Sequence, residues 1–189
     1  MAATEPIRDK KVLRRLAEYW LDKGNIRNYT LIVLGAYTAL RPCDLLRLTW
    51  DDVFDEEHDV FRSHISIVEM KTKKLKSIAL NAKAVNVLRL YFPHRRGSYI
   101  FASTQGYEKA IGRVQAWRII KKAAEAIGEL SHIALYSLRK TAGYHAWKAG
   151  VSPVVLMDMY NHSSYEITRR YLGVSQDDRD KVYLNLALF

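Results

Sequence analysis

The sequence predicts a mainly α-helical domain with one small antiparallel β-sheet, an α+β fold. Apolar residues recur at helical spacing over most of the chain, whereas one stretch near residues 61–80 changes to alternating spacing. Glycines, among them Gly128 and Gly150, fall where helical stretches end. The 189 residues, 49% of them hydrophobic, are enough for one domain with a core of its own.

The helices follow from spacing and from residues that mark helix ends. In the first helical segment, Leu13, Leu16 and Trp20 recur every three or four positions. Ser163 and Glu166 have the spacing of a capping box, which predicts a helix start near them. The expected helices cover residues 9–22, 25–40, 44–48, 81–92, 112–127 and 137–149, with further starts near 153, 163 and 175.

The strands are predicted from alternation. Phe61, Ser63, Ile65 and Ile67 share one parity, which is typical of a strand with one buried face. Residues 75–80 supply an antiparallel partner, and a basic turn joins the two strands. A short edge strand is expected over residues 99–101.

The composition limits which partners and cofactors the protein can have. Thirty basic against 20 acidic residues leave a net charge of +10, which favours a polyanionic partner, most commonly nucleic acid. A single cysteine, Cys43, excludes an intrachain disulfide and a cysteine-based zinc site, and no spacing indicates a metal or a cofactor. No apolar run has the length of a membrane span. We therefore expect a cytoplasmic protein with no membrane partner.

Three separated motifs have chemistry-bearing residues. The first is T-A-L-R-P-C-D-L-L-R-L at residues 38–48, and the second is Y-S-L-R-K-T at residues 136–141. The third is N-H-S-S at residues 161–164, with Tyr171 nine residues after its histidine. In this order, with a lysine-bearing hairpin between the first two, they resemble the tyrosine recombinase and integrase family. The likeness extends from about residue 9 to about residue 175.

The resemblance implies a metal-independent DNA strand transferase, and it assigns roles. Arg41 and Arg139 would grip the scissile phosphate, and His162 would donate a hydrogen bond to it. Lys71 would protonate the leaving 5′ oxygen, and Tyr171 would be the nucleophile that forms a 3′-phosphotyrosyl intermediate. Guanidinium groups suit this task because their fork geometry matches a phosphate and they stay charged. A solvated basic turn remains the alternative interpretation of Lys71.

Two positions depart from the family pattern. Tyr136 stands where the family most often has histidine, and a phenol is a poor base near neutral pH. Asn161 replaces a glycine that often precedes the histidine of the third motif. Tyr136 is kept as a candidate catalytic residue. The second function that stays open is a catalytically degenerate DNA-binding protein of the same fold that acts as a regulator.

The expected organisation is a catalytic domain over residues 1–174 and a C-terminal helical segment over residues 175–189. That segment either docks on its own chain or is exchanged between protomers, and both alternatives stay open. The family resemblance implies a DNA-associated protein whose partner is double-stranded DNA, with a homotetramer on DNA and a monomer or weak oligomer alone. Candidate DNA contacts, chosen for charge, are Lys73, Lys74, Lys76, Arg113, Arg118, Lys121 and Lys122.

Overall fold

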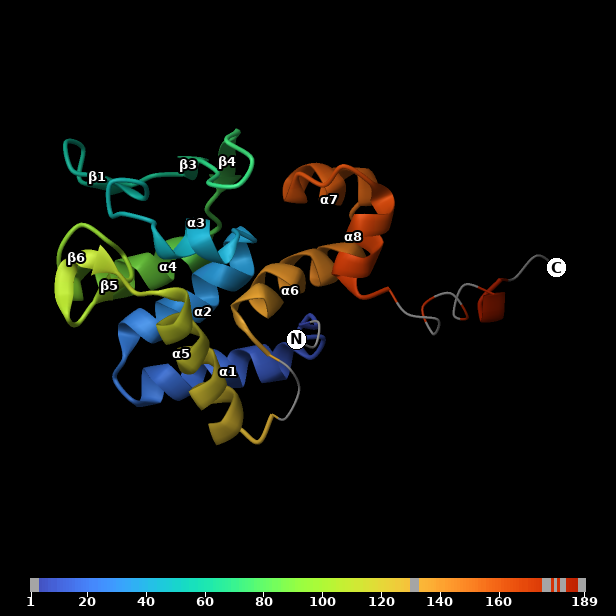
Figure 1. Cartoon of the computed structure of the whole chain (residues 1–189), viewed down its shortest axis with the longest axis horizontal. Coiled ribbons are helices and arrows are strands. Elements are labelled where there is room, and N and C mark those ends of the chain that lie inside the picture. Colours follow the sequence, from blue (N-terminus) through green and yellow to red (C-terminus); the bar gives the residue numbers. More distant parts are fainter. Residues whose placement is uncertain (1–3, 130–132, 175–177, 179, 181–182, 187–189) are drawn as a thin grey trace. The chain divides into compact units, whose positions relative to one another are not determined.

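A computed structural model describes residues 4–129, 133–174, 178, 180 and 183–186. The chain divides into two compact units, Met1–Ala142 and Gly143–Phe189, and the division falls within one helix. The predicted fold class is confirmed, since the structure is mostly helical with short antiparallel strands (Figure 1).

Unit 1 is built on helices that share one apolar core. Leu16 of the first helix and Leu31 and Leu34 of the second are fully buried, as the helical spacing requires. Asp9 and Asn25 begin these helices by accepting hydrogen bonds from Lys11 N and Asn28 N. The helices of unit 1 are α1 (Lys10–Asp22), α2 (Ile26–Thr38), α3 (Pro42–Leu46), α4 (Ala82–Tyr91), the 3-10 helix η1 (Phe92–His94), α5 (Arg113–Ala126) and the first part of α6 (Leu135–Lys148).

The antiparallel strands of unit 1 form three two-stranded sheets rather than one. They are β1 (Phe54–Asp55) with β2 (Val60–Phe61), β3 (His64–Val68) with β4 (Leu75–Ala79), and β5 (Ala102–Ser103) with β6 (Gly106–Ala110). The edge strand expected over residues 99–101 is only an isolated bridge between Thr49 and Tyr99. The β5–β6 hairpin was not predicted, because its strands are short and polar.

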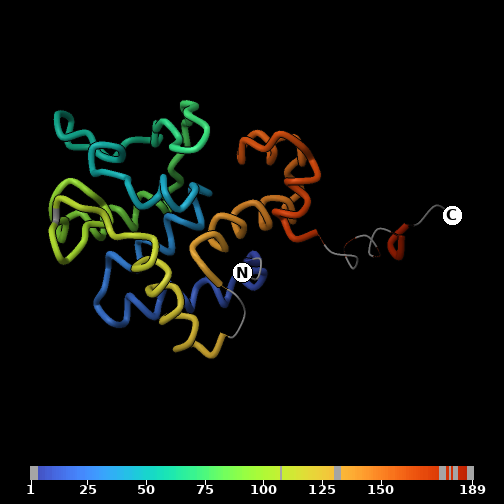
Figure 2. Tube along the Cα trace, in the orientation of Figure 1, coloured from blue at the N-terminus to red at the C-terminus, as the bar shows by residue number. Residues whose placement is uncertain are grey.

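The β3–β4 hairpin follows the predicted alternation. Ile65 pairs with Ile78, and Ile67 pairs with Lys76. Ile65 and Ile67 are buried, whereas His64 and Ser66 between them are exposed. In the Cα trace this hairpin lies at one side of unit 1, and α1 and α5 lie at the opposite side (Figure 2).

Unit 2 contains the rest of α6 and two short helices that pack on each other, α7 (Pro153–Tyr160) and α8 (Tyr165–Leu172). The predicted helix start near 163 is confirmed, but its cap differs. Ser164 is the N-cap and accepts from Ile167 N at 3.4 Å, so the expected pairing of Ser163 with Glu166 does not form the cap. Most of the C-terminal helix predicted from residue 175 lies outside the described residues.

Candidate active site

Arg41 lies directly after a left-handed turn that ends α2. Ala39 has φ 50° and ψ 23°, which reverses the chain, and Pro42 then occupies the first turn of α3. Arg41 is therefore the N-cap of α3, and only 8% of its surface is exposed. A buried guanidinium requires partners that compensate for lost hydration.

Arg139, on the first half of α6, is even more deeply buried, with 2% exposure. Its Nη1 donates a hydrogen bond to the carbonyl of Ala39. The two predicted arginines thus depend on one stretch of backbone. The carbonyl of Ala39 accepts a hydrogen bond from Arg139, and Arg41 follows Ala39 by two residues in the chain. Tyr136, one turn earlier on α6, is 39% exposed.

A fully buried carboxylate, Glu69, lies at the centre of the side-chain contacts around Arg41. Its Oε1 forms an ion pair with Nη1 of Arg41 and lies 3.7 Å from Nζ of Lys76. Its Oε2 accepts a 2.6 Å hydrogen bond from the hydroxyl of Thr72. Glu69 has no exposed surface, so its contacts with the two cations lie in a water-poor environment where ionic interactions are strong.

Lys76 belongs to the same group of charges. Burial and the positive charge of Arg139 lower the pKa of Lys76 below its usual value of 10.5, and Arg41 acts in the same direction. The carboxylate of Glu69 raises this pKa but does not cancel the other effects. The structure therefore brings Arg41, Arg139 and Lys76 into one electrostatic environment.

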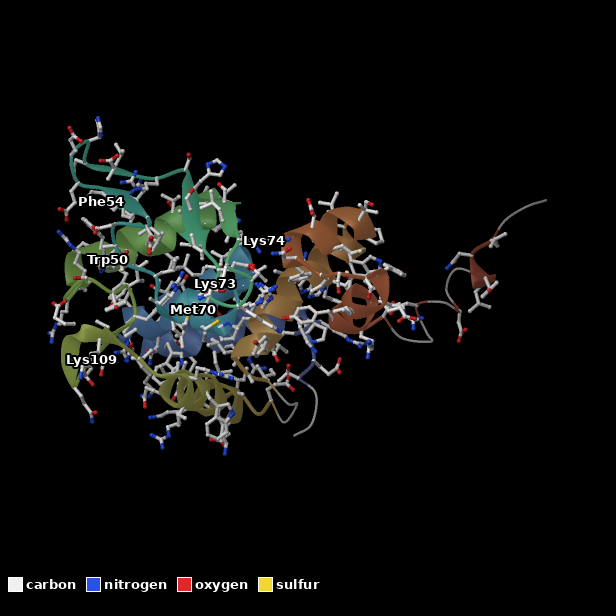
Figure 3. All side chains as sticks on the ribbon, turned by 45° about the horizontal axis from the view of Figure 1, so that its top comes forward. Trp50, Phe54, Met70, Lys73, Lys74 and Lys109 are labelled. Atoms are coloured by element: carbon white, nitrogen blue, oxygen red, sulfur yellow. The ribbon has the colours of Figure 1, made fainter. Side chains whose placement is uncertain are left out.

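Lys71 differs from Lys76 in its surroundings. It lies in the turn of the β3–β4 hairpin and is exposed. Lys73, in the same turn, adopts a left-handed conformation with φ 57°, a position that glycine would occupy at lower cost. Figure 3 shows Met70, Lys73 and Lys74 together at this turn, away from Lys109. The predicted basic turn is thus present, with Lys71 on its solvent side.

The hairpin is tied to α3 by Asp44. This residue is fully buried, and its Oδ1 accepts a 2.9 Å hydrogen bond from the backbone N–H of Met70. Arg47, also from this segment, donates to the carbonyl of Val68 at the end of β3. Asp44 therefore holds the hairpin turn beside the helix that follows Arg41.

Unit 2 brings His162 and Tyr171 together. Their ring centroids are 5.0 Å apart, and both rings contact Tyr160, at 5.1 Å and 4.8 Å respectively. Tyr160 is fully buried, whereas His162 and Tyr171 are half-buried. The three rings form one aromatic cluster, with Tyr160 supporting the two predicted functional residues from below the surface.

The orientation of His162 is fixed by its neighbours. Its Nδ1 lies 3.0 Å from the hydroxyl of Thr168, which also approaches the carbonyl of Ser164 at 3.4 Å. If the threonine hydroxyl donates to Nδ1, the ring proton lies on Nε2, and that N–H is then available to donate to a phosphate oxygen. His162 N bonds to Met157 O at 3.0 Å across a left-handed Asn161, with φ 57°. Asn161 therefore performs the task of the usual glycine.

The candidate DNA contacts fall into two groups within unit 1. Lys73 and Lys74 lie on the hairpin turn, whereas four exposed cations lie on α5: Arg113, Arg118, Lys121 and Lys122. Lys121 pairs with Glu125 at 3.5 Å and lies 5.1 Å above the ring of Trp117. Lys76 belongs to the buried charge group rather than to either exposed group.

Within the residues that the structure describes, no group of three or more His, Cys, Asp or Glu side chains has a geometry that could hold a metal ion. Among the same residues, no helix has the length and apolar character needed to cross a membrane.

Sequence reasoning missed Glu69, Tyr160 and Thr168. Glu69 had a detectable signal: it continues the parity of Ile65 and Ile67, so its side chain was due on the buried face of the hairpin. A charged residue at an inward position is uncommon and requires an ionic partner. Tyr160 and Thr168 had no such signal, because their contacts depend on how α7 and α8 pack.

Solved structures identify the fold. The XerA recombinase is similar with a TM-score of 0.76 at 19% identity, over 96% of this chain and 65% of that one. XerH, in a post-cleavage complex with a palindromic difH substrate, also has a TM-score of 0.76, at 16% identity, over 94% of this chain and 51% of that one. The fold is that of a tyrosine recombinase catalytic domain.

The particular family follows from the sequence match. The chain belongs to the phage integrase family, whose model matches residues 8–177. A probable integrase/recombinase from Bacillus subtilis, YoeC, is 34% identical over 184 residues, which are 97% of each chain. The tyrosine recombinase XerC of Neisseria meningitidis is 25% identical over 90% of this chain but only 56% of its own length. The chain thus spans nearly all of the first relative and about half of the second.

Proposed function

We propose that this chain is the catalytic domain of a site-specific DNA recombinase that cleaves and rejoins strands through a 3′-phosphotyrosyl intermediate at Tyr171. The observation that supports this most is the burial of Arg41 and Arg139 in one charge group with Lys76. A fold alone does not require two arginines to be buried. An anionic group that binds between them gives the arrangement a purpose.

The two arginines bind the scissile phosphate in this proposal. Attack on a phosphodiester gathers negative charge on the non-bridging oxygens, and preorganised guanidinium donors stabilise that charge more in the transition state than in the ground state. Because Arg139 is anchored on the carbonyl of Ala39 and Arg41 on Glu69, neither has to reorganise when the phosphate binds. His162 supplies a further hydrogen bond to the phosphate from unit 2.

The covalent step exchanges one ester for another. The phenol oxygen of Tyr171 attacks phosphorus, the bond from phosphorus to the 5′ oxygen breaks, and a phosphotyrosyl ester forms on the 3′ side. The phenol proton passes to solvent water, and the 5′ oxygen gains a proton from a hairpin lysine, for which the family pattern nominates Lys71. In the reverse step a 5′ hydroxyl attacks the phosphotyrosine. The number of phosphoester bonds is conserved, so rejoining requires no nucleotide hydrolysis.

DNA binding relies on the exposed cations of the hairpin turn and α5, which contact backbone phosphates. Such contacts release counterions and make affinity depend on salt. Strand exchange between two duplexes needs four cleaving protomers, so the proposal includes a homotetramer on DNA. The 15 residues from 175 to 189 are the segment that we expect to act in that assembly, either on their own protomer or on a neighbour.

A trapping assay tests the proposal. Nicked duplexes carry candidate sites from the flanks of the native gene. Cleavage beside the nick releases a short fragment that bears the 5′ hydroxyl, so rejoining cannot occur and the covalent complex accumulates. A denaturing gel then compares wild type with Tyr171→Phe. A shifted band in wild type that is missing in the variant supports the proposal. If both proteins bind DNA and neither forms a band, the chain is the degenerate DNA-binding regulator instead, an outcome that the exposed Tyr136 in place of histidine would then explain.

A further inference from the structure

We propose that Glu69 is a positioning residue of the strand-transfer site, which sets the orientation of Arg41 and keeps Lys76 beside it. The inference rests on the proposed function, because it assigns Glu69 a task in phosphate binding. No motif of the sequence points to this residue. Its evidence is the combination of complete burial with contacts to three different segments: the turn before α3, strand β4 and the hairpin turn.

The two oxygens of the Glu69 carboxylate have different partners. Oε1 takes both cations, Arg41 and Lys76, whereas Oε2 accepts from the hydroxyl of Thr72. The threonine contact fixes the plane of the carboxylate, and the carboxylate plane in turn fixes the guanidinium that pairs with it. A guanidinium has five N–H donors, so one carboxylate oxygen and a phosphate can be bound at the same time.

The charge balance gives a second reason. Arg139 and Arg41 both lower the pKa of Lys76, so the positive charges of the two arginines both repel the ammonium group of this lysine. One buried negative charge among three positive charges reduces this repulsion before DNA arrives. It also leaves a net positive charge, which attracts a phosphate. Glu69 thereby holds Arg41 in a position from which it can bind an anion.

The main experiment compares Glu69→Gln with Glu57→Gln, a control at an exposed carboxylate of the β1–β2 turn. Glutamine keeps the shape and a hydrogen bond to Thr72 but loses the charge. We expect Glu69→Gln to form the Tyr171-linked complex about 10- to 100-fold more slowly, since a misplaced phosphate donor approaches the loss of one. The control should match wild type. A Glu69→Gln rate equal to wild type would overturn the inference while leaving the proposed function intact.

Modified substrates separate positioning of Arg41 from an effect on the lysine donor. A methylphosphonate at the scissile position removes one negative charge, so the ratio of wild-type to Glu69→Gln rates should shrink. A bridging 5′-sulfur makes the leaving group a thiolate, which needs no proton because a thiol has a pKa near 8.5. The rate ratio should be unchanged on this substrate. If sulfur restores the variant and the methylphosphonate does not, Glu69 acts through the proton donor and the inference is wrong.

A measurement without DNA tests whether Glu69 positions Arg41 even if no covalent complex forms. Phenylglyoxal modifies accessible arginines, and mass spectrometry reports each site. We expect Arg41 to react faster in Glu69→Gln than in wild type, with Arg118 on α5 unchanged. Equal reactivity of Arg41 in both proteins would refute its positioning by Glu69. Should Glu69→Gln fail to fold, Thr72→Val removes the Oε2 contact together with a long hydrogen bond from Lys74 N, and it should slow cleavage roughly fivefold, the effect of one ordinary hydrogen bond.

Discussion

Replacing Gly143 by alanine should disturb the aromatic cluster of unit 2. A Cβ at this position would lie 2.1 Å from Oη and 2.6 Å from Cε2 and Cζ of Tyr160, where real Cβ contacts essentially never fall below 3.0 Å. The ring must therefore move by about an ångström, since 3.0 minus 2.1 leaves a 0.9 Å overlap. Tyr160 is fully buried and contacts both His162 and Tyr171, so those rings must shift with it.

Two opposing terms decide the effect on stability. Alanine is better than glycine inside a helix by about 1 kcal/mol. Overpacking a well-packed site costs about 1–3 kcal/mol. We therefore expect Gly143→Ala to lower the free energy of unfolding by about 0–2 kcal/mol, which leaves most of the protein folded at 25 °C. The larger effect should be on cleavage, because a nucleophile displaced by about 1 Å can lose about a hundredfold in rate.

The assay is formation of the Tyr171-linked complex on nicked DNA, with urea unfolding measured on the same samples. Gly112→Ala is the matched control, because a Cβ there meets nothing within 4 Å and its backbone φ is −75°. Adding Tyr160→Phe to Gly143→Ala removes the closest atom and should restore part of the rate. Normal cleavage by Gly143→Ala, or an equal loss in Gly112→Ala, would refute the role of the aromatic cluster.

Four further predictions test separate features. Lys73→Gly should raise the free energy of unfolding by about 1 kcal/mol by relieving the left-handed residue, as urea unfolding would show, and no gain would mean the turn is unstrained. Asn161→Val should lower cleavage by displacing His162, whereas Asn161→Gly should match wild type in the same trapping assay. Because burial lowers the pKa of Lys76, the native state binds fewer protons than the unfolded chain between the lowered pKa and 10.5, so stability should rise with pH over that range. The free energy of unfolding of Lys76→Met should not rise in this way, and a rise that persists in the variant would show that another group causes it. Arg118→Glu should weaken DNA binding and flatten its salt slope, measured by titration at several salt concentrations.

The fold was largely predictable because its main signals are periodic. Helical spacing located α1, α2 and α5 to within one or two residues, and alternation located the β3–β4 hairpin. These patterns record which side of an element meets the core, which is the strongest constraint on a sequence. The β5–β6 hairpin was missed because it covers little of the core and so has little alternation to detect.

The site was predictable where a motif fixes a residue and not where packing chooses it. Arg41 and Arg139 were nominated from their motifs, and the structure places both in one buried charge group. Lys76 was predicted as a DNA contact on charge, yet its side chain is held beside Glu69, because strand register determines which hairpin lysine faces inward. Tyr160 was invisible in the sequence, since its role arises only when a glycine on α6 admits its ring.

The anchoring of Arg139 on a main-chain carbonyl has a consequence for how this sequence can vary. Every residue type offers a carbonyl, so the hydrogen bond to position 39 does not restrict which side chain occurs there. The left-handed backbone does restrict it, because β-branched and bulky residues rarely adopt positive φ. A library at position 39 selected for recombination should therefore return small or left-handed-tolerant residues such as glycine, alanine and asparagine, with selection acting on the shape of the turn and not on any chemistry of the side chain.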